Sequence, residues 1–203
     1  LLPGGGLARG RLTAWRPGGG VTAVLRAACE AVVARGERAA WVDGSGVQSA
    51  DFWRGGPLLI RPSTVREALS SAEELLRSGG FALLVLLGAE RDAAREAVRL
   101  ARAARAGGAA LVAGVTGNPV APLRVVSRIA PDQYRWRHDP FGEPAEVVSV
   151  RVELEARSLG WSGRTHFDLP VRTYGPRLSP ETRLVDRRGT PPAVRWRRSR
   201  THR

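Results

Sequence analysis

The 203-residue sequence contains no lysine and no methionine, and it has a single cysteine. All 32 of its Lys and Arg residues are therefore arginines. One cysteine cannot form an internal disulfide, which is typical of a protein from a reducing compartment. Cys29 falls in a helical stretch after a glycine-rich segment, where we expect a small buried thiol rather than a nucleophile.

Long apolar runs are also missing. The longest, Phe81–Leu87, has the length of a buried strand and is far too short to span a membrane. The sequence shows no charged segment followed by an apolar leader, so we expect a cytoplasmic protein with no membrane contact. A hydrophobic content of 43% and this chain length fit one α/β domain with a real core, plus a tail.

The positive charge is concentrated at the C-terminal end. The net charge is +13, and residues 170–203 carry ten arginines against two acids, Glu181 and Asp186. The first 169 residues are therefore only mildly basic, as ordinary soluble domains are. We predict a folded domain over residues 1–169 and an Arg-rich extended or disordered tail over 170–203.

Residues Leu12–Leu25, LTAWRPGGGVTAVL, have the layout of a strand, a glycine-rich turn and the start of a helix. Glycines let a phosphate-binding loop curl until its N–H groups face an anion, while a Lys and a Ser or Thr hydroxyl complete the site. Here Val21 occupies the Lys position. A tight strand-to-helix turn without any ligand explains the glycines equally well. The candidate nucleotide-binding residues are those of a vestigial loop: Gly18, Gly19, Gly20, Val21 and Thr22.

The hydrophobic pattern before Asn118 predicts strands and helices in the order β-α-β-β-α-β-α-β. Thr64 and Glu67 form a capping box at the start of one helix, and the apolar run at 81–87 is typical of a central parallel strand. This order indicates a parallel sheet with helices on its faces. The expected strands are 11–15, 38–43, 58–61, 81–87 and 109–115, and the expected helices are 22–35, 64–79 and 91–106.

After Asn118 the hydrophobic pattern changes to an alternation of apolar and polar residues. Such alternation is typical of antiparallel strands at a sheet edge, and residues 138–144 read as a turn between two of them. The fold class that we predict is α/β, with a mainly parallel central sheet flanked by helices and antiparallel strands at one edge. The expected edge strands are 123–129, 133–137, 147–155 and 165–169.

Three stretches carry a resemblance to the core of the RecA family. LLPGGGLARGRLTAW resembles that family's approach to its phosphate loop, and AAWVDGSG resembles the strand before its catalytic Glu. STVREALSSAEELLRSGGFALLVLLG resembles the helix and strand that lead to its magnesium-supporting Asp. The resemblance covers about residues 1–169 and implies a RecA-like fold.

The functional positions of the family are replaced in this chain. The resemblance puts the phosphate Lys at Val21, the general base at Ser45, and the Asp of the central strand at Leu87 or Gly88. Phosphoryl transfer relies on positioning and charge stabilisation, so these losses remove most of what drives it. We therefore expect no enzyme, no catalytic residues and no cofactor. The carboxylates that leave an ATPase open as an alternative are Asp43 and Glu90.

The DNA-binding loops of the family are short here. They correspond to residues 88–92 and 116–122, which lack the long glycine-rich and cationic stretch of RecA proteins. A RecA-shaped domain with a glycine loop lacking Lys is similar to the ImuA type, and more distantly to the SulA type. The ImuA resemblance implies an accessory factor in DNA-damage-induced translesion synthesis, with an ImuB-type polymerase relative and RecA itself as partners. The alternatives are a nucleotide-binding ATPase and a SulA-type inhibitor of cell division.

Two arginine groups and one aromatic residue are candidate contact sites. The tail places a Trp among arginines, which suits phosphate contacts and base stacking on DNA, although a solubilising tail has the same composition. Arg91, Arg95, Arg99 and Arg102 follow helical spacing and form either a solvated face or a docking surface. Trp53 is either a partner anchor or a core residue. The tail candidates are Arg195, Trp196, Arg197, Arg198 and Arg200.

The sequence offers no metal site. Its three histidines, His138, His166 and His202, are far apart and lack the Cys or carboxylate spacing of metal ligands.

Overall fold

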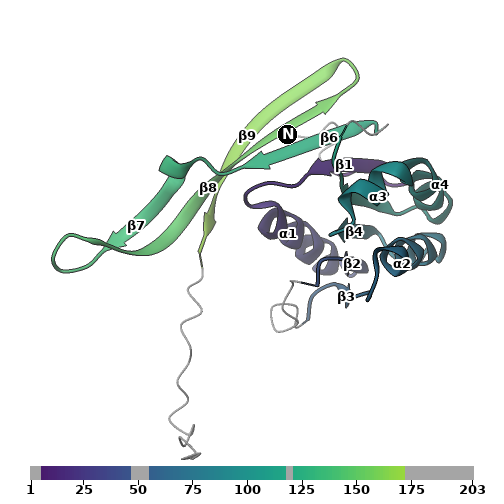
Figure 1. Cartoon of the computed structure of the whole chain (residues 1–203), viewed down its shortest axis with the longest axis horizontal. Coiled ribbons are helices and arrows are strands. Elements are labelled where there is room, and N and C mark those ends of the chain that lie inside the picture. The colour runs from purple at the N-terminus through teal and green to yellow at the C-terminus, as the bar shows by residue number, and fades with distance from the viewer. Residues whose placement is uncertain (1–5, 47–54, 118–120, 172–203) are drawn as a thin grey trace, which may run out of the picture. The chain divides into compact units, whose positions relative to one another are not determined.

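The computed structural model describes residues 6–46, 55–117 and 121–171 (Figure 1). These residues form a layered α/β fold, with helices on a mixed sheet, as the sequence predicts. The helices are α1 (Val21–Val33), α2 (Val65–Arg77), α3 (Glu90–Arg95) and α4 (Ala97–Gly107). The strands are β1 (Leu12–Arg16), β2 (Ala39–Asp43), β3 (Leu58–Ile60), β4 (Leu83–Leu87), β5 (Ala110–Gly114), β6 (Leu123–Arg128), β7 (Tyr134–His138), β8 (Pro144–Ser158) and β9 (Trp161–Pro170).

The strands form one sheet in the order β3-β2-β4-β5-β1-β6-β8-β7, with β9 pairing β8. Every pairing from β3 to β6 is parallel, and every pairing made by β8 is antiparallel. The carboxyl ends of β2, β4, β5 and β1 therefore lie along one edge. In open sheets of parallel strands this edge is where ligands bind.

Helix α2 begins where the capping pattern predicts. The Oγ1 of Thr64 accepts a hydrogen bond from the backbone N–H of Glu67 at 3.1 Å, which satisfies one of the free donors of the first turn. The carboxylate of Glu67 accepts from the N–H of Ser63, one residue before the cap. The predicted end at Gly79 is also confirmed, because this residue follows the helix with a φ of 67°.

Two apolar clusters fill the space on the two faces of the sheet. On one face, helices α2 and α4 pack on β1, β2, β4 and β5 through side chains such as Leu76 and Leu100. On the other face, α1 packs through Leu25 and Val32 on a sheet area that extends to β6 and β8. The first cluster, with its helices, ends at β1, whereas the second continues to β6 and β8 on the other face. One face of β6, β8 and β9 is therefore left without a helical cover (Figure 1).

The single helix predicted at 91–106 is two helices. Glu96 ends α3 and begins α4 with φ −90° and ψ 6°, outside the helical region. Ala93 and Ala97 on either side of this residue are both buried in the cluster between the helices and the sheet. Alanine-rich sequence has the same helical propensity on both sides of such a bend, and propensity therefore gave no sign of it.

The expectation of antiparallel pairing at 123–129 is wrong for one partner. Strand β6 pairs parallel with β1 and antiparallel with β8. The alternation of buried and exposed residues in β6 reflects its one uncovered face, not the direction of its neighbours. Strands β8 and β9 are also longer than predicted, because β8 pairs with β6 and β7 on one side and with β9 on the other.

Every helix in the described part of the chain is too short or too polar to cross a lipid bilayer. The predicted tail lies outside the described residues except for Pro170, which ends β9, and Val171. The division into residues 1–169 and 170–203 stays a prediction.

Candidate functional site

The predicted strand, glycine turn and helix are present as β1, residues 17–20 and α1. The N–H of Val21 donates to the carbonyl of Gly18 at 3.3 Å, which closes a four-residue turn. Gly20 has φ 80° and ψ −3°, the values of the third residue in a type II turn, and only glycine adopts them without cost. The amide of Val21 is therefore used inside the turn.

The three glycines are packed against neighbouring strands. A Cβ on Gly18 would fall well inside contact distance of the carbonyl of Ser127 in β6. A Cβ on Gly20 would lie 2.7 Å from Cγ2 of Val152 in β8. Real Cβ atoms essentially never come within 3.0 Å of such atoms. Glycine is thus required at these positions by close packing, whether or not an anion is bound.

Two positions of the phosphate-loop pattern carry large apolar side chains. Counting back from Thr22 by the G-x-x-x-x-G-K-[ST] spacing puts Trp15 at the first Gly and Val21 at the Lys. Trp15 is buried, and its Nε1–H donates to Oγ of Ser127 at 3.2 Å. Val21 is half-buried and packs on the same cluster as α1. Both side chains serve the core, and neither offers charge to a phosphate.

Asp43, the first carboxylate that could rescue nucleotide chemistry, is engaged by its own loop. It ends β2 and is fully buried. Its Oδ1 accepts hydrogen bonds from the N–H and Oγ–H of Ser45, at 3.1 and 2.5 Å, and from the N–H of Gly46 at 3.1 Å. Three hydrogen bonds to one oxygen hold the carboxylate in place, and through them Asp43 stabilises the turn at residues 43–46.

Backbone fills the space between the carboxyl ends of β2 and β4. The N–H of Gly44 donates to the carbonyl of Leu87 at 2.8 Å, and Gly88 has a φ of 80°. A Cβ on Gly88 would collide with the backbone of Gly44 and Ser45. No side chain of any kind fits at Gly88, where the resemblance places one of the two alternatives for the metal-supporting Asp.

The second rescuing carboxylate, Glu90, is likewise used locally. Its Oε1 accepts from the N–H of Gly88 at 2.9 Å. The side chains of Leu87 and Glu90 lie over Gly114, the last residue of β5, where a Cβ would be 2.8 Å from Leu87 and 3.3 Å from Glu90. The side chains of Leu87 and Glu90 therefore cover Gly114, while backbone contacts join the ends of β2 and β4.

The thiol of Cys29 is buried in the cluster under α1. Burial, with a smaller contribution from the nearby charge of Glu30, raises its pKa to about 12. A thiol with such a pKa is protonated at neutral pH and is a poor nucleophile. The expectation of a small buried thiol is confirmed.

The predicted arginine row is divided between two helices. Arg91 and Arg95 lie on α3 and Arg99 and Arg102 lie on α4, with Glu96 between the two helices, and all four arginines are exposed. Arg99 pairs with Glu73 of α2 at 3.4 Å and with Glu96 at 3.1 Å. Its guanidinium therefore ties α4 to α2, which sequence spacing along one helix did not predict.

Several predicted contact residues lie outside the described part of the chain. These are Trp53 and the tail residues Arg195, Trp196, Arg197, Arg198 and Arg200. Their roles stay predictions. Of the three histidines, His138 ends β7, His166 lies in β9, and His202 is also outside the described residues.

The sequence did not predict two exposed surfaces of the antiparallel region. One, here called the arginine face, lies on the uncovered side of β6, β8 and β9 and includes Arg16 at the end of β1. The other, here called the aromatic hairpin, belongs to β7 and the turn into β8, where exposed large side chains gather. Strand alternation was visible in the sequence, but it did not reveal which strands pair. The arginine face consists of Arg16, Arg124, Arg128, Arg157 and Arg164; the aromatic hairpin consists of Tyr134, Trp136 and Phe141.

Comparisons with known proteins give little beyond this geometry. No family model matches the chain, and no curated protein matches it. Among solved structures, the crystal structure of the RadB recombinase is similar at a TM-score of 0.49 and 16% sequence identity. The match covers 76% of this chain and 84% of that one.

Proposed function

We propose that this chain is a non-catalytic accessory protein with a RecA-like fold, acting in DNA-damage-induced translesion synthesis and mutagenesis. It would work in the cytoplasm by binding protein partners, an ImuB-type polymerase relative and RecA itself. Its Arg-rich tail would add non-specific DNA contacts. The proposal combines the ImuA-type resemblance of the sequence with the closed geometry around the glycine turn.

One observation carries the non-catalytic part of the proposal: Gly88 is packed against the Gly44–Ser45 backbone. Triphosphate hydrolysis needs an open space for the terminal phosphate, with a carboxylate and a metal nearby. In this chain the corresponding strand ends hold each other by a hydrogen bond and direct backbone contact. Val21 stands where the phosphate Lys would be, and the nearby carboxylates of Asp43 and Glu90 accept hydrogen bonds from their own loops.

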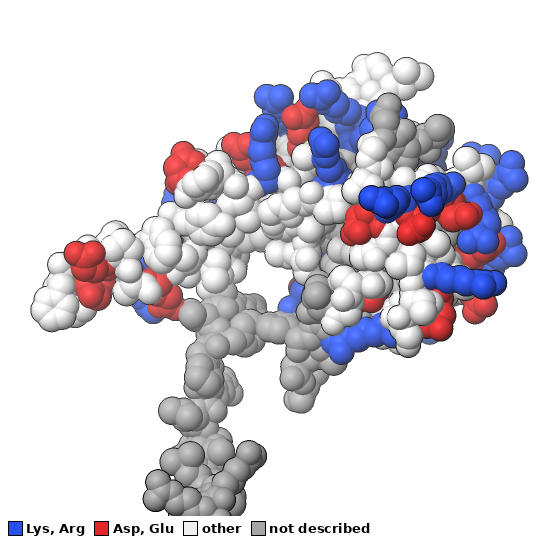
Figure 2. Space-filling model, in the orientation of Figure 1, with Lys and Arg blue, Asp and Glu red and all other residues white. Residues whose placement is uncertain are grey.

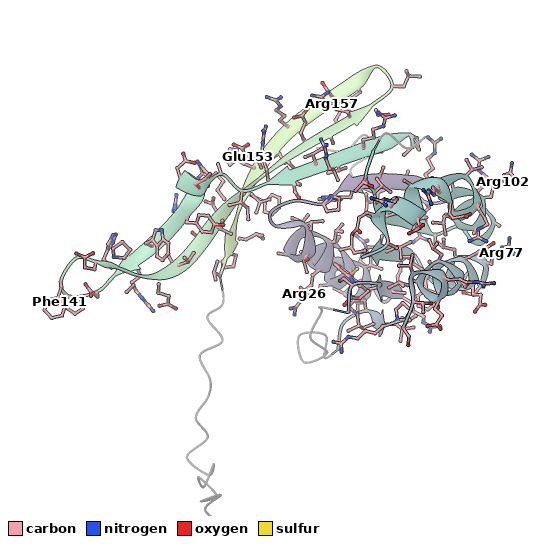
Figure 3. All side chains as sticks on the ribbon, in the orientation of Figure 1. Arg26, Arg77, Arg102, Phe141, Glu153 and Arg157 are labelled. Carbon is pink, nitrogen blue, oxygen red and sulfur yellow. The ribbon has the colours of Figure 1, made fainter. Side chains whose placement is uncertain are left out.

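The aromatic hairpin supports a partner-binding role. Trp136 of β7 is 47% exposed. Phe141, in the turn between β7 and β8, is 90% exposed and is labelled at the hairpin tip in Figure 3. Large aromatic side chains in contact with water are a frequent mark of protein interfaces, because their burial supplies most of the binding energy. Strand β7 is also an edge strand with every residue exposed. We assign this hairpin to the ImuB-type partner.

A binding experiment with matched variants tests the proposal. The full chain is titrated with a purified ImuB-type protein and, separately, with RecA, and complex formation is followed by calorimetry and by size-exclusion chromatography with light scattering. The double variant Trp136→Ala with Phe141→Ala should weaken the ImuB-type complex at least about tenfold, as loss of interface hot spots does. The control is Leu159→Ala, a fully exposed apolar residue in the β8–β9 turn.

A cellular measurement complements it. Deleting the gene should lower the frequency of damage-induced mutations, and the Trp136→Ala, Phe141→Ala variant should fail to restore it. Absence of any complex with either partner, together with an unchanged mutation frequency, contradicts the proposal. Loss of binding in the Leu159→Ala control to the same extent contradicts the assignment of the hairpin.

A further inference from the structure

We propose that the arginine face binds the sugar–phosphate backbone of a nucleic acid. This site belongs to the folded domain and is separate from the tail, to which the DNA contacts were assigned above. It rests on the register and charges of β1, β6, β8 and β9, and it holds whichever pathway the protein serves.

Strand register brings these arginines together. Arg124 of β6 lies directly opposite Arg157 of β8. In the next strand, Arg164 of β9 lies opposite Glu155 of β8. Arg16 ends β1 and lies opposite Val126 of β6, two residues from Arg124 on the same side of that strand. Because side chains of one register pair share a face, the arginines of four neighbouring strands point to the same side of the sheet.

Strand register places two residues of like charge, Arg124 and Arg157, directly opposite each other. Like charges opposite each other on neighbouring antiparallel strands are destabilising, and opposite charges or Thr pairs are the stabilising choices. Both arginines are exposed, and neither is needed to fill the core. Glu155 offsets part of the charge of Arg157, and a polyanion along the strands would offset the excess positive charge of the whole face.

Acidic residues on this face offset only part of the charge. Glu153 pairs with Arg128 at 3.0 Å, while Glu155 pairs with both Arg157 and Arg164. Arg151 and Asp168, farther along the same side, pair with each other at 2.9 Å, so six arginines share this side of the sheet with two glutamates and one aspartate. Figure 2 shows basic side chains, with a few acidic ones among them, over β6 and the β8–β9 hairpin. Figure 3 labels Arg157 and Glu153 on this hairpin.

The face is also hollowed. A groove of about 380 Å³ has Ala14 and Val115 in its floor and Arg16, Arg124 and Arg128 among its walls. Small side chains such as Ala14 leave the sheet backbone close to the surface here. An extended chain of phosphates can therefore lie along the strands while guanidiniums reach it from both sides.

The dimensions favour a polymer over a single phosphate. With about 4.8 Å between strands and about 3.4 Å per residue, the arginine face spans roughly 14 Å in each direction. A free phosphate or a nucleotide would need several of these arginines to converge on one point. A spread of guanidiniums suits a nucleic acid, whose binding gains from release of condensed counterions at each phosphate contact.

Arginine footprinting on the full-length protein tests the site without any mutation. The protein is treated with phenylglyoxal, which modifies exposed arginines, in the presence and absence of a mixed-sequence oligonucleotide, and each arginine is quantified by mass spectrometry. We expect at least about threefold protection at Arg16, Arg124 and Arg157. Arg77 of α2 and Arg102 of α4, both exposed on the helical side, should stay unprotected (Figure 3).

Salt-dependent binding of matched variants provides the second measurement. Fluorescence anisotropy with single-stranded and duplex oligonucleotides compares Arg16→Gln with Arg164→Gln against the control pair Arg77→Gln with Arg102→Gln. Both pairs change net charge equally and leave the tail intact. Removing two phosphate contacts should lower the salt slope by about 1.4 for single strands and about 1.8 for duplex. The control should keep the wild-type slope.

Three results overturn the proposal. One is equal slopes for both variant pairs, which would leave the tail as the whole DNA contact. Another is protection confined to tail arginines. The third is equally strong binding and protection by polyglutamate, which would mark the face as a site for an acidic protein. Circular dichroism spectra and thermal melting curves of each variant check that it is folded, so that a loss of binding does not result from unfolding.

Discussion

Gly88 and Ser45 touch through their backbones, at a distance that leaves no room for a side chain on Gly88. The contact joins the loop after β2 to the loop after β4, and Gly44 adds a hydrogen bond of 2.8 Å to the carbonyl of Leu87. These two loops correspond to the places where the sequence resemblance puts catalytic carboxylates. This contact between the two loops is therefore made by the backbone, not by side chains.

The first prediction concerns the stability of this contact. Gly88→Ala should lower the free energy of unfolding by about 3 kcal/mol, since it adds both a positive-φ penalty and a backbone collision. Gly36→Ala is the matched control, with a φ of 77° and nothing within 4 Å of its Cβ. Denaturant unfolding should show a cost of only about 1 kcal/mol for the control. Equal costs for the two variants would mean that the Gly88 contact is loose.

Restoring the missing lysine should not restore nucleotide binding. In Val21→Lys the charge returns to the position expected of a phosphate loop, but the turn glycines stay packed on β6 and β8. Calorimetric titration with ATP and magnesium should show no saturable binding heat. The variant should also lose a little stability, because Val21 packs on the core. Tight binding of ATP by this variant would show that only the lysine had been lost.

Acidification should weaken one ion-pair group on the arginine face. The hydrogen bond from Arg157 and the charges of Arg157 and Arg164 outweigh the effect of desolvation and lower the pKa of Glu155 below its ordinary 4.5. Its stabilising effect is therefore present above the unfolded pKa and is lost as pH falls through the folded value. NMR should find this carboxyl titrating below 4.5 in the wild type and closer to 4.5 in Arg157→Gln. An unchanged midpoint in the variant would contradict the pairing.

Removing the same glutamate should strengthen nucleic-acid binding. Glu155→Gln frees Arg157 and Arg164 from their shared carboxylate, and a surface ion pair of this kind competes with phosphate only weakly. Anisotropy should show affinity higher by about threefold, within the range expected for one exposed ion pair. Glu74→Gln, on an exposed position of α2, removes one negative charge elsewhere and serves as the control. Equal gains from both variants would point to net charge alone.

Local signals in the sequence predicted much of the fold. The glycine turn between β1 and α1, the capping box at Thr64 and the apolar run of β4 each depend on residues close together in the chain. The bend at Glu96 was not predictable, because alanine and arginine favour helix equally on both sides of it. The parallel pairing of β6 with β1 depends on long-range contacts that alternation does not encode.

The candidate site was predicted only in part, for a similar reason. The replacement of Lys by Val21 is visible in the sequence, and the predicted strand, glycine turn and helix around it are present as β1, residues 17–20 and α1. That Gly88 touches Ser45 is not visible, since a glycine gives no sign of what lies beside it. The arginine face requires the register of four strands, and in the sequence Arg16 and Arg164 are simply distant exposed residues.

The most direct test is calorimetric titration of the full-length protein with ATP and magnesium, followed by a phosphate-release assay on the same sample. We expect no saturable binding up to millimolar nucleotide and no phosphate release above the buffer rate. Saturable binding with a 1:1 stoichiometry and steady phosphate release would contradict the closed site, and with it the proposal that this protein works only by contact.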